Sequence, residues 1–506
     1  MSAKPEDGKS LHRVETGLPG LDEVLRGGLF AGAVYIVRGA PGAGKTIIAN
    51  QICFHHAREG RRALFVSLLA ESHARMLQHM GTLSFFETDA IPRSLYYVSA
   101  FRILEQDGLK GLMDLLRREM RAHQATLLIL DGLLAVEETS GSDRAFRKFI
   151  HELQAHAATS NCTTLLLTNG SRAEYHPEHT MVDGLIALSD TAIGKRKQRE
   201  LEVMKFRGSG HLRGRHPYRI TDDGAVIYPR IEARYAPRDA DAPARRLPLG
   251  VDALDRMMEG GPICGTTTML LGASGTGKTT IGTHFLSRSS AEEPGLHFGF
   301  YETPPRLVAN ARAVGLDLGA LVDAGHLEIQ WYAPTEQILD QLGGKLIDTV
   351  RRRGVKRLFI DGLGGYVAAA DLPERVSPFF AALTNELRAL GVTTVYTAET
   401  DNLVGPTVAV PVEGISAIVE NVVLLRFAEF RAQLHRIVSV MKVRGSGFDP
   451  RLREFSITDR GIVVSDAPEG AEALLSGFGT ERGAAPSPAT RSSSSSERAP
   501  LGKKPR

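Results

Sequence analysis

The chain contains two copies of one sequence pattern, and this duplication constrains its fold more than any other feature. Each copy has, in the same order, a G-x-x-x-x-G-K-T loop, an apolar run that ends in aspartate, and a K-x-R-G-S-G segment. The loop lysines Lys45 and Lys278 are 233 residues apart, and the aspartates Asp131 and Asp361 are 230 residues apart. Near-constant separations over independent motifs indicate that a whole domain is duplicated in tandem.

The duplication divides the 506-residue chain into five segments. We predict two domains, at residues 10–232 and 247–466, each of a size usual for a single domain. Residues 1–9 are predicted to be a polar N-terminal arm, and residues 233–246, rich in alanine, proline and charge, a linker. The Gly-, Ala-, Pro- and Ser-rich residues 467–506 predict a disordered tail.

Both copies alternate short apolar runs with helical stretches. In the first copy the runs include AVYIV, ALFVSL, TLLILD and TTLLLTN, and they are separated by stretches such as GLKGLMDLLRREMRAH. Buried strands that alternate with helices predict a mostly parallel sheet flanked by helices on both faces. The expected fold class is therefore α/β, with one such sheet in each of two tandem domains.

The composition limits which cellular compartment and which classes of partner we expect for this protein. The 61 basic and 58 acidic residues give a net charge of only +3, which disfavours a protein that coats nucleic acid. The three cysteines are far apart and have no disulfide or zinc spacing, as in a reducing cytosol. The polar start has no signal peptide, and no run approaches the ~20 apolar residues of a membrane span. We therefore expect a soluble, cytoplasmic protein.

The two glycine-rich loops are the strongest indication of chemistry. Each follows an apolar strand and opens a helix, the arrangement in which backbone N–H groups surround phosphate oxygens at a helix N-terminus. The candidate ATP-binding residues are Gly39, Ala40, Pro41, Gly42, Ala43, Gly44, Lys45 and Thr46 in the first copy, and Gly272, Ala273, Ser274, Gly275, Thr276, Gly277, Lys278 and Thr279 in the second. Both lysines are expected to reach the β- and γ-phosphates and act in catalysis.

A magnesium ion is the second expected cofactor, beside ATP. The hydroxyls of Thr46 and Thr279 are candidate ligands, and Asp131 and Asp361 are candidate carboxylates for the ion's water shell. Each aspartate ends a buried strand, at the sheet edge where the phosphate loop also lies. An aspartate there is often only a turn residue. Its similar distance from the loop lysine in both copies, 86 and 83 residues, favours the metal role.

A base that orients water is the third requirement of hydrolysis. Glu71 and Glu302 come just after the strand that follows each phosphate loop, and they are the candidate catalytic bases. The alternative is an exposed glutamate at the start of a helix, where the helix dipole favours negative charge. Thr168 and Thr397, at the last core strand of each copy, are candidates for sensing the γ-phosphate, although threonine is also common in strands.

The tandem copies resemble the KaiC family of RecA-superfamily ATPases over about residues 10–466, on three sets of motifs: TGLPGLDEVLRGG, the loops GAPGAGKT and GASGTGKT, and the segments KFRGSG and KVRGSG. The resemblance implies two tandem RecA-like P-loop NTPase domains and a homo-hexameric double ring with ATP between neighbouring subunits. It also implies that four residues act in trans on the neighbour's ATP: Lys205, Arg207, Lys442 and Arg444. Cations supplied in this way neutralise charge on the transferred phosphoryl group.

Two departures from the family pattern concern catalysis. The family has two adjacent glutamates after the second strand, whereas this chain has SLLAESH with Glu71 displaced by one position, and GFYETPP with Tyr301 beside Glu302. The family's second domain phosphorylates itself on an adjacent serine and threonine. Here Ser416 fits the serine and Ala417 replaces the threonine, so only single phosphorylation at Ser416 is open, with an ordinary turn serine as the alternative.

The expected function is Mg·ATP binding and hydrolysis by a double ring that regulates an unidentified protein partner in signalling or timing, with autophosphorylation on serine as an additional hypothesis. One alternative is a DNA-dependent recombinase or helicase-type ATPase, because residues 194–219 are rich in lysine and arginine. The other alternative is a nucleotide-holding scaffold with weak catalysis, because each copy has a single glutamate.

Overall fold

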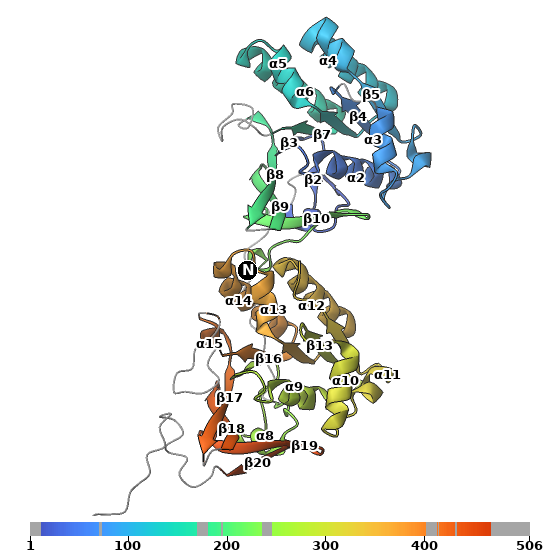
Figure 1. The fold of residues 1–506 in the computed structure, drawn as a ribbon. Helices are drawn as coiled ribbons and strands as arrows, with labels where there is room; N and C mark the ends of the chain where they lie inside the picture. The colour runs from blue at the N-terminus through green and yellow to red at the C-terminus, as the bar shows by residue number, and fades with distance from the viewer. Residues whose placement is uncertain are drawn as a thin grey trace, which may run out of the picture.

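The computed structural model describes residues 12–69, 73–169, 181–193, 196–234, 245–400, 412, 414–430 and 433–466. Two α/β domains lie one above the other in Figure 1, the first in blue to green and the second in yellow-green to red. Each contains a nine-stranded sheet, counted over the described residues, and helices pack on both of its faces. None of the helices in these residues is long and apolar enough to cross a membrane.

The first sheet has the strand order β11-β10-β9-β8-β3-β7-β6-β4-β5. Its strands are β3 (Val34–Gly39), β4 (Ala63–Ser67), β5 (Leu95–Ser99), β6 (Leu127–Asp131), β7 (Thr163–Thr168), β8 (Gly184–Ile193), β9 (Arg196–Phe206), β10 (Arg215–Thr221) and β11 (Gly224–Ile227). Strands β3 to β8 pair in parallel, and β8 to β11 pair antiparallel. A small separate ladder joins β1 (Arg13–Val14) to β2 (Leu29–Phe30).

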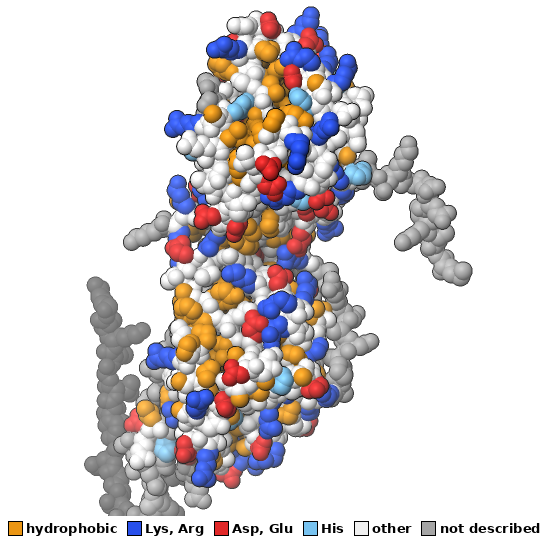
Figure 2. Space-filling view, turned by 90° about the vertical axis from the view of Figure 1, so that its right-hand side faces the viewer, with side chains coloured by type: hydrophobic (Ala, Val, Ile, Leu, Met, Phe, Trp, Pro, Cys, Tyr) orange, Lys and Arg blue, Asp and Glu red, His pale blue; other side chains and the backbone are white. Residues whose placement is uncertain are grey.

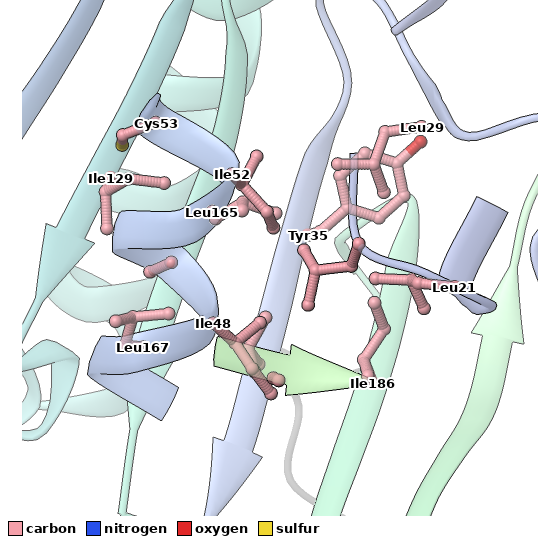
Figure 3. Packing of buried hydrophobic residues seen from close by; sticks show 14 of the residues in the cluster. Leu21, Leu29, Tyr35, Ile48, Ile52, Cys53, Ile129, Leu165, Leu167 and Ile186 are labelled. Carbon is pink, nitrogen blue, oxygen red and sulfur yellow. The ribbon is translucent and has the colours of Figure 1, made fainter. Parts of the chain in front are cut away.

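The helices of the first domain follow the strands in alternation. They are α1 (Leu21–Val24), α2 (Lys45–Arg58), α3 (His73–Met80), η1 (Thr88–Ala90), α4 (Phe101–His123), α5 (Leu133–Thr139), α6 (Asp143–Ser160) and η2 (Ile231–Ala233). Figure 3 shows α2 lying on one face of the sheet, with its apolar side chains toward residues of β6 and β7: Ile48, Ile52, Cys53, Ile129, Leu165 and Leu167. The opposite face is covered by α4 and α6.

The second domain repeats this arrangement, with the strand order β14-β13-β15-β16-β12-β17-β18-β19-β20. Its strands are β12 (Thr267–Gly272), β13 (Gly295–Gly299), β14 (Leu327–Trp331), β15 (Arg357–Asp361), β16 (Thr393–Glu399), β17 (Asn421–Phe430), β18 (Gln433–Val443), β19 (Arg453–Thr458) and β20 (Gly461–Asp466). Its helices are α8 (Asp252–Met257), α9 (Lys278–Leu286), α10 (Pro304–Ala313), α11 (Leu318–Asp323), α12 (Leu339–Arg353), α13 (Leu363–Ala369), η3 (Pro373–Arg375), α14 (Val376–Ala389) and α15 (Ile415–Ile418).

The prediction of two mostly parallel sheets flanked by helices is confirmed. The antiparallel part of each sheet, from β9 to β11 and from β18 to β20, goes beyond that prediction. Strand β9 reads RKQRELEVMKF, in which charged residues interrupt the apolar run that identifies a buried strand. The three cysteines, Cys53, Cys162 and Cys264, are buried and unpaired, as expected from their spacing.

A buried ion cluster joins the two domains. The guanidinium of Arg375 in the second domain donates hydrogen bonds to Glu232 Oε1 at 2.9 Å, Asp340 Oδ2 at 2.9 Å and Asp371 Oδ1 at 3.2 Å. Glu232 lies in η2, at the end of the first domain. Asp371 also accepts a bond of 3.0 Å from Gln198 of β9. The cluster therefore ties β9 and η2 to the helices of the second domain.

Candidate nucleotide sites

Each phosphate loop runs from the carboxyl end of the central strand into the N-terminus of a helix. The loop after β3 leads into α2, and the loop after β12 leads into α9. Gly44 and Gly277, the last loop glycines, have φ of 92° and 99°, which side-chain-bearing residues rarely adopt. A Cβ on Gly42 would meet nothing within 4 Å, so the outer side of this loop is open to a ligand.

The loop lysines are buried and turn back onto their own loops. Lys45 Nζ donates to the carbonyls of Gly39 at 2.6 Å and Ala40 at 3.1 Å. Lys278 Nζ donates in the same way to Gly272 and Ala273, at 2.8 Å each. Because their ammonium groups are withdrawn from water, both lysines are suited to bind an anion that enters the loop.

Burial lowers the pKa of both loop lysines. For Lys45 the opposing influence is the negative charge of Asp131. For Lys278, Glu399 and Asp361 oppose the shift. In each loop, therefore, the desolvation of the lysine outweighs the stabilisation by nearby carboxylates, and a phosphate at the loop would add the negative charge that favours the ammonium form.

A threonine and an aspartate from distant parts of the chain meet beside each loop. Thr46 Oγ1 donates to Asp131 Oδ2 at 3.2 Å, and Thr279 Oγ1 donates to the two oxygens of Asp361 at 3.1 and 3.3 Å. A hydroxyl and a carboxylate are hard oxygen donors of the kind that Mg²⁺ prefers, with waters and phosphates as its other ligands. The donor set fits a magnesium ion bound together with a nucleotide. The described residues contain no group of three or more His, Cys, Asp and Glu that could hold a metal alone.

The threonines suggested as γ-phosphate sensors are not equivalent positions. Strand register places Thr168 beside Arg38 and Ala398 beside Leu271, so Ala398 is the counterpart of Thr168, and Thr397 corresponds to Leu167. Thr397 Oγ1 donates to Asp361 Oδ1 at 2.9 Å and accepts a bond of 2.8 Å from the Gly362 backbone. Thr397 therefore supports the carboxylate of the second site, where the first site has leucine.

The two predicted bases follow their strands at different distances in the sequence. Ser67 pairs with Asp131, and Gly299 pairs with Asp361; Glu302 comes three residues after Gly299, whereas Glu71 comes four residues after Ser67. Glu71 lies outside the described residues. Glu302 accepts a hydrogen bond of 3.1 Å from Asn310 Nδ2 of α10, the helix that follows it.

The residue two positions after Ser67 and the residue two positions after Gly299 both lack a carboxylate. Leu69 stands there in the first domain and Tyr301 in the second, with 43% and 60% of their surface exposed. The ring of Tyr301 packs over the backbone of Gly362 and Gly364, where a Cβ would lie 2.4 and 2.6 Å from its atoms. Burial raises the pKa of Tyr301, and the nearby charges of Glu399 and Asp361 raise it further.

Each K-x-R segment lies at the opposite end of the sheet from its own phosphate loop. The backbone N–H of Arg207 donates to Asp183 O at 2.8 Å, and the Asp183 carboxylate accepts a bond of 3.0 Å from the N–H of Val34, at the start of β3. The loop begins at Gly39, at the far end of that strand. Five strand residues span about 16 Å.

The second domain repeats this geometry. Arg444 N–H donates to Glu420 O at 3.1 Å, and Glu420 accepts a bond of 2.9 Å from the N–H of Thr267, at the start of β12. Lys442 Nζ donates to the carbonyls of Ser416 at 2.8 Å and Val419 at 2.7 Å. Ser416 is exposed in α15, so its hydroxyl is accessible from outside the domain.

One residue beside the second site was not predicted from the sequence. Glu399 Oε1 lies 3.6 Å from Lys278 Nζ, and Glu399 pairs in register with Gly272, the first loop glycine. Asn169 follows the corresponding strand of the first domain. The indication available in the sequence was the segment TAET, set against LTNG in the first copy.

The fold and the paired loops define a tandem RecA-like P-loop protein, with two α/β domains that each carry one loop, one threonine–aspartate pair and one K-x-R segment. A family model for the KaiC ATPase domain matches residues 14–232 and again residues 247–469. The chain therefore belongs to the KaiC family of ATPases.

Curated relatives match nearly the whole chain. The KaiC circadian clock oscillator protein of Picosynechococcus sp. (strain PCC 7002) is 27% identical over 491 residues, which cover 93% of each chain. The KaiC 1 oscillator protein of Synechocystis sp. (strain PCC 6803) is 26% identical over 494 residues, covering 93% of this chain and 92% of its own. KaiC of Synechococcus elongatus is 26% identical over 491 residues, with the same coverage.

Proposed function

We propose that this protein binds Mg·ATP at both phosphate loops, hydrolyses it and thereby acts as a regulator in signalling or timing. The loop N–H groups and Lys45 or Lys278 hold the phosphates, and Thr46 or Thr279 binds the magnesium ion. Asp131 and Asp361 hold the water shell of that ion. The proposal is supported by the threonine–aspartate contacts beside both loops and by membership of an ATPase family.

We propose further that the chain forms a homo-hexameric double ring, in which each ATP lies between neighbouring subunits. The observation that carries this proposal is the distance of Arg207 and Arg444 from their own loops, about one strand length away. A cation at that end of the sheet cannot reach its own phosphates, but it can reach those of a neighbour in a ring. Lys205 and Lys442 take part from the same strands.

Mixing two inactive variants tests action in trans. The first variant, Lys45→Ala/Lys278→Ala, lacks the lysine of each phosphate loop. The second variant, Arg207→Ala/Arg444→Ala, lacks the arginines that act on a neighbour. We expect each protein alone to lose ATPase activity. An equal mixture, co-expressed with different tags, should regain about a quarter of wild-type activity, because a random ring has that share of intact interfaces. An inactive mixture in which both tags co-purify would show that the arginines serve their own chain.

Autophosphorylation at Ser416 is part of the proposal for the second ring. Its support is the exposed position of Ser416 in α15, whose carbonyl groups are held by Lys442 of the K-x-R segment. Incubation with Mg·ATP followed by mass spectrometry should find phosphate on Ser416 and none in Ser416→Ala. A wild-type protein that hydrolyses ATP and carries no phosphate there would remove this activity and leave the ATPase in place.

We propose that nucleic acid is not the partner. In the described part of residues 194–219, several cations have carboxylate neighbours: Arg196 with Glu336 at 3.4 Å, Lys197 with Asp190 at 3.9 Å and Arg215 with Glu202 at 3.5 Å. Figure 2 shows basic and acidic side chains intermixed over this face of both domains. Stimulation of the ATPase by single-stranded DNA, with a steep dependence on salt, would overturn this view.

We propose that the partner of the ring is a regulatory protein and that both are in the cytoplasm. The three buried, unpaired cysteines fit a reducing compartment. The curated relatives are named circadian clock oscillator proteins, which is the basis for timing as one of the proposed roles.

A further inference from the structure

The second site has a carboxylate beside its phosphate loop that belongs neither to the loop nor to the threonine–aspartate pair. Glu399 ends β16, the strand between the strand of Asp361 and the strand that leads into the loop. Its side chain is 62% exposed, and its Oε1 forms an ion pair with Lys278 Nζ at 3.6 Å. An exposed carboxylate beside the ammonium group of a loop lysine is accessible both to water and to the γ-phosphate of a nucleotide bound at the loop.

The backbone holds Glu399 in this place. Register pairs it with Gly272 of β12, and the N–H of the next residue, Thr400, donates to Gly272 O at 3.3 Å. The negative charge of Glu399 raises the pKa of Tyr301 and opposes the lowering of the pKa of Lys278, so its carboxylate lies near both groups. A group fixed to a strand end is held more accurately than one on a loop.

The other carboxylate considered for this task is hydrogen-bonded to the helix that follows it. Glu302 accepts a hydrogen bond from Asn310 on α10. The position before it, nearer to the strand, carries Tyr301, whose ring covers Gly362 and Gly364 next to Asp361. Among these described side chains, Glu399 is the carboxylate that contacts the loop lysine and does not belong to the threonine–aspartate pair.

We propose that Glu399 is the catalytic base of the second domain. This inference rests on the proposed ATPase function. Without nucleotide Glu399 pairs with Lys278; when ATP binds, the lysine moves its contact to the phosphates and the carboxylate faces the attacking water. Glu399 accepts a proton from that water while the oxygen of the water bonds to the γ-phosphorus. The bond from the γ-phosphorus to the bridging oxygen breaks, ADP leaves with that electron pair, and the proton passes to solvent.

The assignment predicts a difference between the two domains. At the positions equivalent to Tyr301 and Glu399, the first domain carries Leu69 and Asn169, neither of which can accept a proton from water. The assignment of this base therefore applies to the second domain alone.

The test uses the full chain with its first loop disabled by Lys45→Ala, so that hydrolysis reports on the second domain. In this background Glu399→Gln should slow turnover about 100-fold, the usual contribution of a general base. Binding of Mg·ATP should stay within about twofold, because the phosphate loop and the magnesium site are intact. Glu399→Asp, which keeps the carboxylate, should recover part of the rate. Glu374→Gln, which removes an exposed carboxylate of the same domain, is the matched control and should hydrolyse at the parent rate.

Each other outcome has a definite meaning. If Glu399→Gln binds ATP more tightly and hydrolyses it at the parent rate, Glu399 only pairs with the empty lysine, and the assignment is wrong. If Glu302→Gln loses turnover instead, the base is Glu302. If the Lys45→Ala parent binds Mg·ATP but never hydrolyses it, while Lys278→Ala does, the second domain is not an ATPase, and the assignment fails while the proposed function survives in the first domain. If wild type shows no hydrolysis, both fail.

Discussion

In the second domain the helix after the phosphate loop touches the sheet where Gly282 meets Phe359: a Cβ on Gly282 would lie 2.1 Å from the Phe359 ring. The equivalent pair in the first domain, four residues after the loop lysine and two before the aspartate, is Ala49 and Ile129, both buried in one core cluster. The two domains thus fill the same space with different pairs, one small and one large residue in each.

This exchange predicts a rescue. Gly282→Ala should destabilise the second domain by about 1–3 kcal/mol, because the methyl group overpacks the contact with Phe359. The double variant Gly282→Ala/Phe359→Ile, which copies the first domain, should recover most of that loss in a denaturant titration. Strict additivity of the two substitutions would show that the residues do not share the space.

The threonine–aspartate contacts predict a magnesium requirement at each site. Asp131→Asn and Asp361→Asn should each raise the magnesium concentration needed for half-maximal ATP turnover by at least about tenfold, since a neutral amide holds the water shell of the ion poorly. The readout is ATPase rate against magnesium concentration, with the other domain disabled at its loop lysine. Asp107→Asn and Asp323→Asn, which replace exposed aspartates of the respective domains, are the controls and should leave the dependence unchanged.

The ion cluster between the domains predicts a large cost for removing its cation. Arg375→Met leaves Asp340, which has no exposed side-chain surface, without its charged partner, and it removes one of the two arginines that pair with Glu232. We therefore expect a loss of about 3–5 kcal/mol in unfolding free energy. Burial already raises the pKa of Asp340 to about 6 against the effect of Arg375. The matched control is Arg351→Met, whose ion pair with Glu386 is on the surface and should cost less than about 1 kcal/mol.

A result of the same size for both arginines would show that the cluster is as solvated as a surface pair. Two separate unfolding transitions in Arg375→Met, where wild type has one, would indicate that the cluster also couples the domains.

His216 predicts a loss of stability in acid. It is fully buried and bonded on both sides: its Nδ1 accepts from the N–H of Arg230 at 3.0 Å, and its Nε2 donates to Leu212 O at 3.1 Å. Burial is the main reason that its pKa is lowered to about 4, and the charge of Arg230 adds to the shift. The neutral form is favoured in the fold, so its stabilisation is complete above the unfolded pKa of about 6.5 and is lost as the pH falls toward 4.

The expected loss from this histidine is about 3 kcal/mol between pH 7 and pH 4. His216→Asn keeps an acceptor for Arg230 and has no group that titrates in this range. Its urea midpoint should therefore depend less on pH than that of wild type, and parallel curves for the two proteins would contradict the assignment.

The sequence by itself determined the duplication, the α/β class and the phosphate loops, because these depend on local signals: strand-length apolar runs, glycines where the backbone turns, and motifs that recur at constant spacing. It also indicated Asp131 and Asp361, since a residue at the end of a buried strand has its place fixed by the strand. The polar strands β9 and β18 were beyond this reasoning, because pairing with a neighbour, and not an apolar run, makes them strands.

Only the tertiary structure decided which residues correspond between the two domains. Strand register showed that Thr397 matches Leu167 and that Asn169 matches Glu399. A displacement of one residue moves a side chain to the other face of a strand or away from the loop, and sequence spacing alone is not accurate enough to detect it. The contact between Lys278 and Glu399 joins positions 121 residues apart, and it exists because parallel strands bring their carboxyl ends to one edge of the sheet.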